Sequence, residues 1–198
     1  MVSMPPLETE RLMIRPFTMD DLDVVHRLLD VDLRDADFGT EGAVSRDERE
    51  RWLRWTVMNY EELAKLYQPP YGDRAVTLKQ TGQVIGACGY VPCLAPFGQL
   101  PSLRAGSVDN DFEGLLSPEF GLFYAFSPVF QRQGYATEAA RALIDYAFGQ
   151  LNLRRVVAMT TYDNVASMGV MRKLGMRIEK NPLDDPEWFQ VVGMVEKR

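Results

Sequence analysis

The stretch Gln131–Gln150, QRQGYATEAARALIDYAFGQ, joins two kinds of pattern through a glycine. The apolar run FGLFYAF ends just before it and is typical of a strand, whereas apolar residues from Ala139 to Ala147 recur at helical spacing. Gly134 stands at the corner between them. A helix that begins at such a corner presents unpaired backbone N–H groups at the positive end of its dipole. The corner is therefore a candidate anion site, and an ordinary strand-to-helix turn fits the same pattern.

The residues around Gly134 suit close approach by a ligand. Glycine admits a left-handed backbone, Ala136 keeps the surface low, and the Thr137 hydroxyl adds a donor. Neither G-x-G-x-x-G nor G-x-x-x-x-G-K-[ST] is present, which excludes the two commonest nucleotide loops. The local pattern alone thus indicates an anion without identifying it.

Composition limits the classes of function. The 198 residues, 46% of them hydrophobic, are enough for the core of one domain, and we expect a single domain over residues 1–198. A net charge of −6 argues against a general nucleic-acid binder, so an anionic ligand must be held locally. Cys88 and Cys93 lack the spacing of a zinc site or a disulfide framework, and we expect free thiols and no metal.

The sequence carries no pattern of export or membrane insertion. MVSMPPLETE lacks a basic segment followed by an apolar core, and no apolar run approaches the roughly 18 residues of a membrane span. We therefore expect a cytoplasmic protein without a membrane partner.

The first half of the chain predicts alternating strands and helices. RLMIR, residues 11–15, alternates as a half-buried strand, and Thr18 is a good N-cap for a first helix. Ser45 and Glu48 form a capping box for a second helix. Its apolar stripe is expected to lie in the core and comprises Trp52, Trp55, Met58, Leu63 and Leu66. A hairpin follows, with strands near 74–78 and 83–91 and a turn through Thr81 and Gly82.

The second half begins with a break in the pattern. Residues 92–118 are rich in Pro, Gly and Ser, and we expect a long loop insertion. Strands are predicted at EFGLFYAF and RRVVAMTT, a short helix from Asn164 to Leu174, and a final strand pair in MRIEK and EWFQVVGMVEK. The fold class is α/β (α+β), with no internal repeat.

Three segments together resemble the GNAT N-acetyltransferase superfamily. QRQGYATEA is similar to its Q/R-x-x-G-x-G/A acyl-CoA pyrophosphate loop, through Gln131, Gly134 and Ala136. LETERLMIRPFTMDDLDVVHRLL resembles the opening strand and helix of the subfamily that includes ribosomal-protein N-terminal acetyltransferases. NVASMGVMRKLGM resembles the N-x-x-S-x-x-x-x-x-K-x-G-F segment, with Met176 where Phe is usual.

The resemblance implies a mixed, mostly antiparallel sheet flanked by helices and splayed between the strand ending at Phe126 and the strand ending near Thr160. Acetyl-CoA, a cosubstrate, would lie in that gap. The residues that the resemblance implies for its binding are Tyr124, Ala125, Phe126, Gln131, Arg132, Gln133, Gly134, Tyr135, Ala136, Thr137, Asn164, Ser167 and Met171. Among them Arg132 fits a solvated surface arginine equally well.

The implied chemistry is direct attack of a primary amine on the thioester. Glu119 is the candidate base, directly or through a water, and a solvated strand-end carboxylate fits it equally well. Met171 stands where many relatives place the tyrosine that protonates the thiolate, a departure that leaves Ser167 as the candidate thiolate stabiliser. A helix-interior serine is the plain alternative for Ser167. His26, the only histidine, is expected at the surface, and Tyr162 is a weaker donor candidate.

The acceptor is indicated by charge alone. Residues 30–46 and 92–118 hold Asp32, Asp35, Asp37, Glu41, Asp109, Asp111 and Glu113. Clustered carboxylates favour a cationic small molecule or a protein N-terminus, and solvated loop charges are the alternative. Two other functions remain open: a non-catalytic acyl-CoA-binding or regulatory module, motivated by Met171 and the uncertain base, and a nucleotide phosphate binder. The sequence leaves the oligomeric state open, a homodimer included.

Overall fold

The structure is a computed structural model that describes residues 4–35, 42–103, 115–183 and 185–197. The chain folds as two compact units, each made of two segments. Unit 1 comprises Met1–Val91 and Phe123–Tyr146, and unit 2 comprises Pro92–Leu122 and Ala147–Arg198. Two strands and one helix continue from one unit into the other, so we describe the elements first and then each unit by itself.

Within the residues that the structure describes, eight strands form the sheet. They are β1 (Leu7–Glu8), β2 (Leu12–Pro16), β3 (Gly72–Leu78), β4 (Val84–Ala95), β5 (Ser117–Phe126), β6 (Arg155–Thr160), β7 (Arg177–Lys180) and β8 (Val191–Glu196). Hydrogen bonds order them β1-β2-β3-β4-β5-β6-β8-β7. β5 pairs with β6 in parallel, whereas β1–β2, β2–β3, β3–β4, β6–β8 and β7–β8 are antiparallel. The mixed, mostly antiparallel sheet confirms the predicted fold class.

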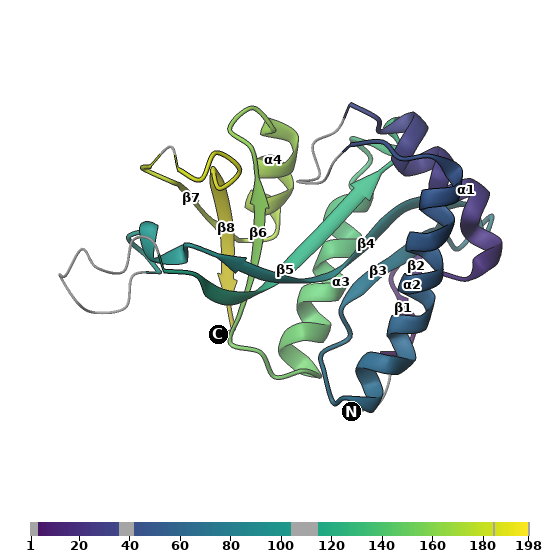
Figure 1. Ribbon diagram of the computed structural model, residues 1–198, viewed down its shortest axis with the longest axis horizontal. Coiled ribbons are helices and arrows are strands. Elements are labelled where there is room, and N and C mark those ends of the chain that lie inside the picture. Colours follow the sequence, from purple (N-terminus) through teal and green to yellow (C-terminus); the bar gives the residue numbers. More distant parts are fainter. Residues whose placement is uncertain (1–3, 36–41, 104–114, 184, 198) are drawn as a thin grey trace. The chain divides into compact units, whose positions relative to one another are not determined.

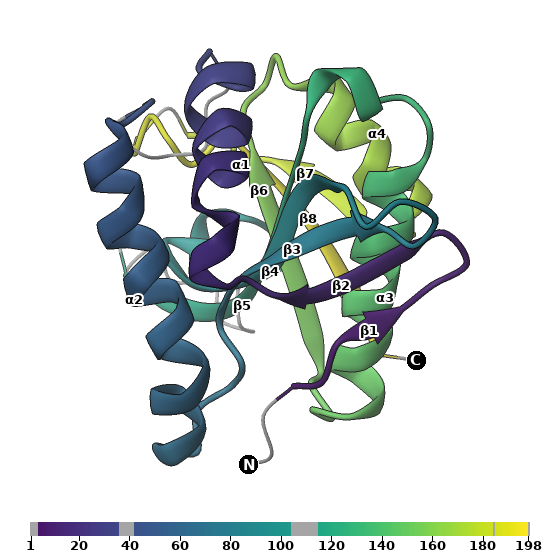
Figure 2. The ribbon, with the colours of Figure 1, turned by 90° about the vertical axis from the view of Figure 1, so that its right-hand side faces the viewer.

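In the described part of the chain, four α-helices accompany the sheet. They are α1 (Leu22–His26), α2 (Arg46–Lys65), α3 (Tyr135–Gly149) and α4 (Val165–Lys173). A short 3₁₀ turn, Met19–Asp21, precedes α1, and a wider π turn, Arg27–Asp32, follows it. In unit 1, α1 and α2 lie on one face of β2–β4 and α3 lies on the other (Figure 2). In unit 2, α4 packs against β6 and β7 (Figure 1).

The core of unit 1 fills the space between its sheet and the pair α1–α2. Phe17, Val25 and Leu53 are almost wholly buried there, and Ala75 and Ala87 supply the facing surface of the sheet. Small residues on the strands let the helices approach closely.

Two strands of unit 1 also need a glycine. A Cβ at Gly86 would lie 2.6 Å from the Ala125 carbonyl oxygen, closer than any real contact, so only glycine lets β4 and β5 come together here.

The second helix confirms its predicted start but not its predicted buried face. Ser45 and Glu48 bond each other reciprocally at the N-terminus of α2, as a capping box does. The prediction that the apolar stripe is core was wrong for Trp55 and Met58, which are each 59% exposed, and for Leu66, which is 66% exposed. The helix instead turns the row that contains Leu53 and Thr56 inward.

The predicted loop at 92–118 is shorter than expected. β4 continues through Pro92 to Ala95, and β5 already begins at Ser117. Pro92 is exposed within its strand, where a missing N–H costs little. Residues 104–114 lie outside the described part of the chain.

Unit 2 has its own core under β6 and β8. Val157, Val192, Met194 and Phe189 are buried there with residues from 93 to 100. The ring of Phe97 meets that of Phe189 edge to face at 5.5 Å. A pair of buried amides strengthens this contact, because Asn181 donates to Gln99 Oε1 at 2.8 Å and Gln99 donates to the Asp185 carbonyl at 2.9 Å. These bonds tie the start of the 96–116 connection to the β7–β8 loop.

Candidate functional site

The corner that precedes α3 has the backbone that an anion loop needs. After β5 the chain makes a 3₁₀ turn, Pro128–Phe130, and Arg132 and Gly134 then take positive φ angles of 59° and 86°. The first hydrogen bond of α3 runs from the Glu138 N–H to the Gly134 carbonyl at 3.0 Å. The N–H groups of Tyr135, Ala136 and Thr137 consequently have no acceptor inside the helix.

Two glutamines of the loop stabilise its shape through side-chain hydrogen bonds. Gln131 Nε2 donates to the Phe126 carbonyl at 3.0 Å, and Gln133 Nε2 donates to the Val129 carbonyl at 3.0 Å. The first bond reaches back to the end of β5 and the second to the 3₁₀ turn, and both hold the loop in shape without using its backbone amides. The predicted pyrophosphate residues from Gln131 to Thr137 thus lie together in unit 1.

Sequence reasoning missed two residues that touch this loop. The Arg11 guanidinium lies over the Tyr135 ring at 4.3 Å and donates to the Gln133 carbonyl at 3.0 Å. Arg11 also forms an ion pair with Glu138, in the first turn of α3, at 2.6 Å. The two residues are 127 positions apart in the chain, and nothing in the local pattern of either one indicates the contact.

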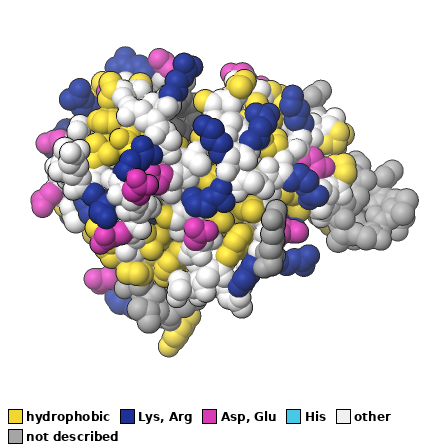
Figure 3. Space-filling view, turned by 180° about the vertical axis from the view of Figure 1, so that it is seen from behind, with side chains coloured by type: hydrophobic (Ala, Val, Ile, Leu, Met, Phe, Trp, Pro, Cys, Tyr) yellow, Lys and Arg dark blue, Asp and Glu magenta, His cyan; other side chains and the backbone are white. Residues whose placement is uncertain are grey.

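Charged side chains of both signs cover the molecule as seen from behind. Figure 3 shows Lys and Arg side chains interspersed with Asp and Glu. Arg132, in the loop before α3, and Arg141, in α3, are exposed. Both lie in unit 1 with the loop and add positive charge to a chain whose net charge is −6.

In unit 2, Asn164 begins α4. Its Oδ1 accepts a hydrogen bond from the Ser167 N–H at 3.0 Å, which makes Asn164 the N-cap of the helix. Asn164 and Ser167 are therefore both at the first turn of α4, half-buried, as the family motif implies. The cap uses the side-chain amide oxygen of Asn164 as a hydrogen-bond acceptor. The side-chain amide nitrogen can donate to other groups.

Met171 has a structural role that was not expected. Its side chain is fully buried, and a Cβ built at Gly193 would lie 2.8 Å from its sulfur. Glycine in β8 thus makes room for the thioether in the core of unit 2. Met171 therefore packs on the side of α4 that faces β8, and its contact with a cofactor stays a prediction.

Glu119 lies near the start of β5 in unit 2, beside a cation. Arg155 in β6 donates to both carboxylate oxygens of Glu119 and also contacts Glu196 at 3.3 Å. These bonds raise the pKa of Arg155, chiefly through the hydrogen bond to Glu119. A carboxylate held in this way is positioned by its partner, so any role of Glu119 as a base involves Arg155 as well.

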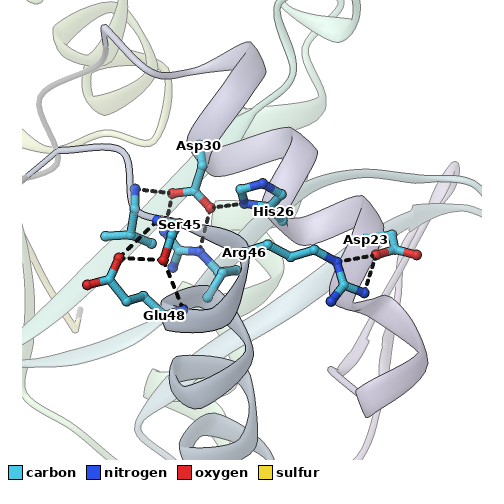
Figure 4. Close-up of polar contacts among 8 residues, drawn as sticks. Asp23, His26, Asp30, Ser45, Arg46 and Glu48 are labelled. Carbon is cyan, nitrogen blue, oxygen red and sulfur yellow. Dashed lines mark hydrogen bonds and ion pairs between the residues drawn. The ribbon is translucent and has the colours of Figure 1, made fainter.

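His26 belongs to a polar cluster in unit 1 rather than to open surface. Its Nδ1 lies 2.9 Å from the Asp30 carboxylate, which also binds Arg49 at 2.7 Å and accepts from the Val44 N–H at 3.0 Å (Figure 4). Burial raises the pKa of Asp30, but the bonds from Arg49 and Val44 outweigh it and leave the pKa below its usual range. The cluster joins the helical segment around Asp30 to the start of α2.

Both cysteines are buried free thiols, as predicted. Burial raises the pKa of the Cys93 thiol to about 11 and that of the Cys88 thiol further. Neither side chain is a thiolate nucleophile at neutral pH.

The acidic residues predicted to face the acceptor are described only in part. Asp32 accepts from the Ser127 hydroxyl at 3.2 Å, and Asp35 is exposed. Asp37, Glu41, Asp109, Asp111 and Glu113 lie outside the described residues.

Unit 2 carries a small hollow of its own. It is lined by Tyr162, Leu183, Pro186, Glu187, Phe189 and Gln190. The Tyr162 hydroxyl donates its hydrogen bond to the Asn181 carbonyl at 2.9 Å. Its proton is therefore engaged within unit 2 rather than offered to a thiolate.

Within the described ranges, no group of three or more His, Cys, Asp or Glu side chains is placed to hold a metal ion. The same part of the chain contains no helix that is both long and apolar enough to cross a membrane.

Known proteins resemble most or all of the chain. It is 38% identical over 166 residues to spermidine N(1)-acetyltransferase from Escherichia coli K12, a match that covers 84% of this chain and 73% of that protein. The crystal structure of an acetyltransferase from Agrobacterium tumefaciens matches with a TM-score of 0.70 and 24% identity, over 100% of this chain and 97% of that one. RimL, a ribosomal L7/L12 α-N-protein acetyltransferase solved with coenzyme A, matches with a TM-score of 0.62 and 15% identity, over 96% and 94% of the two chains.

The family model described as acetyltransferase (GNAT) domain matches residues 11–177. That range contains the opening strand, the loop before α3 and the first turn of α4, which are the three segments that carry the resemblance in the sequence. The chain belongs to the GNAT acetyltransferase family.

Proposed function

We propose that this protein transfers the acetyl group of acetyl-CoA to a primary amine. The observation that carries the proposal is the loop Gln131–Thr137, where positive φ angles at Arg132 and Gly134 leave the first amides of α3 for a ligand. The match to the GNAT family model and the coenzyme A in the RimL structure support CoA as that ligand.

The proposal gives each unit a role. In unit 1 the loop binds the pyrophosphate through backbone N–H groups, and the backbone of Tyr124–Phe126 pairs with the pantetheine arm. In unit 2 Asn164 binds the cofactor, and Ser167 donates a hydrogen bond to the sulfur as the thiolate leaves. These roles come from the family motif, and the observed positions of Asn164 and Ser167 at the first turn of α4 support them.

The reaction has simple requirements. The amine nitrogen attacks the thioester carbon, the carbon–sulfur bond breaks, and the amine loses one proton while the CoA thiolate gains one. About one in ten α-amino groups is neutral at pH 7, whereas a lysine-like amine is almost wholly charged. Glu119, held by Arg155, is the proposed base, directly or through a water.

The acceptor is proposed to be cationic. Asp32 and Asp35 are the described members of the acidic set, and the relative from Escherichia coli is named for spermidine. Carboxylates near an entrance steer cations, and this steering weakens when the Debye length falls to about 8 Å at physiological salt. A protein N-terminus is the other acceptor that this charge favours.

The cellular location remains part of the proposal. Two buried free thiols agree with a reducing compartment such as the cytoplasm.

The test is an amine panel with acetyl-CoA, in which acetylated product is measured by mass spectrometry and free CoA by a thiol reagent. Spermidine and a basic N-terminal peptide should react faster than neutral or anionic amines of similar size, and more so at low salt. A preference for anionic amines, or indifference to salt, would remove the cationic acceptor from the proposal.

A second candidate is a non-catalytic acyl-CoA-binding module. The packing of Met171 against Gly193 and the pairing of Glu119 with Arg155 favour it, because both side chains are engaged within unit 2. Calorimetry separates the two candidates from a protein that does not bind CoA, and turnover separates them from each other. Binding of acetyl-CoA without product from any amine would support the module.

A further inference from the structure

A carboxylate stands where the pyrophosphate loop needs positive potential. Glu138 is in the first turn of α3, four residues after Gly134, and its backbone N–H makes the first bond of the helix. A carboxylate there is favourable for the helix dipole. The same charge would repel a phosphate and could compete with it for the amides of residues 135–137.

The carboxylate is held by groups outside the helix. Glu138 Oε1 accepts from the Thr9 hydroxyl at 2.5 Å and from the Arg11 N–H at 2.9 Å. Its Oε2 accepts from Arg11 Nε at 2.7 Å and lies 2.6 Å from Arg11 Nη2. Both oxygens are therefore engaged by the segment between β1 and β2, on which Thr9 and Arg11 lie.

Arg11 also touches the loop itself. Its Nη1 donates to the Gln133 carbonyl at 3.0 Å, and a Cβ at Gly134 would lie 3.4 Å from Nη2. In a planar trans peptide the C=O of one residue and the N–H of the next point in opposite directions. Since the Gln133 carbonyl points to Arg11, the Gly134 N–H points away from Arg11.

The charges of Arg11 and Glu138 compensate each other. Burial raises the pKa of Glu138, but the bonds from Thr9 and Arg11 outweigh it and leave the pKa below its usual range. Glu138 is therefore ionised at neutral pH, and Arg11 supplies the compensating charge. Arg11 thus bonds Glu138 and the Gln133 carbonyl and lies over the Tyr135 ring, so its side chain links the first turn of α3 to the loop.

We propose that Arg11 is a positioning residue for the CoA pyrophosphate, acting together with Thr9 on the carboxylate of Glu138. Arg11 neutralises Glu138, draws its carboxylate away from the first amides of α3, and turns the Gly134 N–H outward. This inference rests on the proposed binding of acetyl-CoA by the same loop. On this inference, the affinity of the loop for an anion depends on the contact of Thr9 and Arg11, between β1 and β2, with Glu138.

If Arg11 acts by neutralising Glu138, CoA affinity should depend on the charges at positions 11 and 138. A contact that only stabilises the fold would not predict this dependence. Arg11→Ala leaves Glu138 ionised and unpaired beside the loop, so CoA should bind about tenfold more weakly, equivalent to about 1.4 kcal/mol. Glu138→Gln removes the negative charge and should change the dissociation constant by less than about threefold. The double variant should bind CoA more tightly than Arg11→Ala alone, because the repulsive charge has gone.

The experiment is calorimetry with CoA on the full chain, with acetyl-CoA kinetics wherever turnover is detected. The KM for acetyl-CoA should rise in Arg11→Ala while kcat is retained, since the pyrophosphate is bound equally in ground and transition states. Arg54→Ala, which breaks an exposed ion pair with Glu50 on α2, is the matched control and should bind CoA as the parent does. If Arg11→Ala does not fold, Arg11→Lys keeps the charge but loses the paired contacts, and it should bind CoA less tightly than the parent.

The outcomes separate this inference from the proposed function. A parent that binds no CoA overturns the proposed function and the positioning role with it. A parent that binds CoA, with Arg11→Ala or Arg11→Lys binding equally well, overturns the positioning role alone. A double variant no better than Arg11→Ala also overturns it, because the repulsion from Glu138 would then have no effect on the ligand.

Discussion

Gly134→Ala tests the loop at its most constrained residue. The backbone of Gly134 has φ of 86°, a left-handed conformation that costs an L-residue about 1–2 kcal/mol. The nearest atom to an added Cβ is Arg11 Nη2 at 3.4 Å, the far end of a flexible side chain, so the steric cost is small. The backbone conformation therefore determines the expected effect.

This conformational cost lowers either the stability of the variant or its affinity for CoA. If the variant keeps the loop shape, the free energy of unfolding falls by about 1–2 kcal/mol, and each kcal/mol lowers Tm by about 2–4 °C in a chain of this size. If the free loop relaxes instead, the cost appears when CoA binds, as a dissociation constant about 5- to 30-fold higher. Gly134→Val should show the larger effect, since a β-branched residue tolerates positive φ least.

The assay combines thermal unfolding with CoA calorimetry. Gly149→Ala at the other end of α3 is the control, because its added Cβ meets nothing within 4 Å and its φ is not positive. This control should be as stable as the parent or more stable by about 0.5–1 kcal/mol. A Gly134→Ala protein with unchanged stability and unchanged CoA affinity would refute the argument from backbone conformation.

Three further predictions follow from other residues. Ser167→Ala should lower kcat more than acetyl-CoA affinity, because a thiolate donor acts in the transition state, and an unchanged kcat would leave Ser167 with a structural role only. Glu119→Gln should slow acetyl transfer most at low pH, where the amine is mostly protonated, and parallel pH–rate profiles in parent and variant would remove Glu119 from the mechanism. Asp21→Asn should lower the free energy of unfolding by about 1–3 kcal/mol at pH 7, because buried Asp21 binds Arg15 through two bonds of 2.7 and 2.8 Å. Burial raises the pKa of Asp21, but the bonds from Arg15 outweigh it and leave the pKa below normal, so this stability is present above the unfolded pKa of about 3.9 and is lost as the pH falls through the folded value. A difference between parent and variant in urea titrations that persists unchanged below pH 3 would contradict this account of Asp21.

Local patterns predicted the elements that depend on local physics. The capping box at Ser45 and Glu48 and the glycine corner at Gly134 each involve a few neighbouring residues, and the structure has a helix end at each. Propensity and capping act within a turn or two, so one stretch of sequence contains the needed information.

The inward face of α2 could not be predicted in this way. Trp55 and Met58 are apolar at helical spacing, yet the sheet accepts the row that contains Leu53 and Thr56. The choice depends on the small residues Ala75 and Ala87 in distant strands, which leave room for a particular face of the helix. Periodicity gives the presence of a face, whereas tertiary packing selects which apolar residues it buries.

The predicted site residues come from segments of the family motif that are contiguous in sequence. The loop residues from Gln131 to Thr137 and the pair Asn164–Ser167 are neighbours in sequence. Arg11 reaches Glu138 across the chain, and its exposed ion pair looks like an ordinary surface charge until the loop beside it is seen. The packing of Met171 could not be predicted for a similar reason, since only the glycine of β8 shows that its side chain has room in the core.

The most direct test of the central claim is acetyl transfer by the parent protein. Acetyl-CoA and an amine panel that includes spermidine and a basic N-terminal peptide are incubated with the protein, and CoA and acetylated amine are quantified together. The account predicts that both products appear in equal amounts and only when protein, acetyl-CoA and a cationic amine are all present. Acetyl-CoA that binds the protein but yields no acetylated amine with any acceptor, or that does not bind at all, would contradict it.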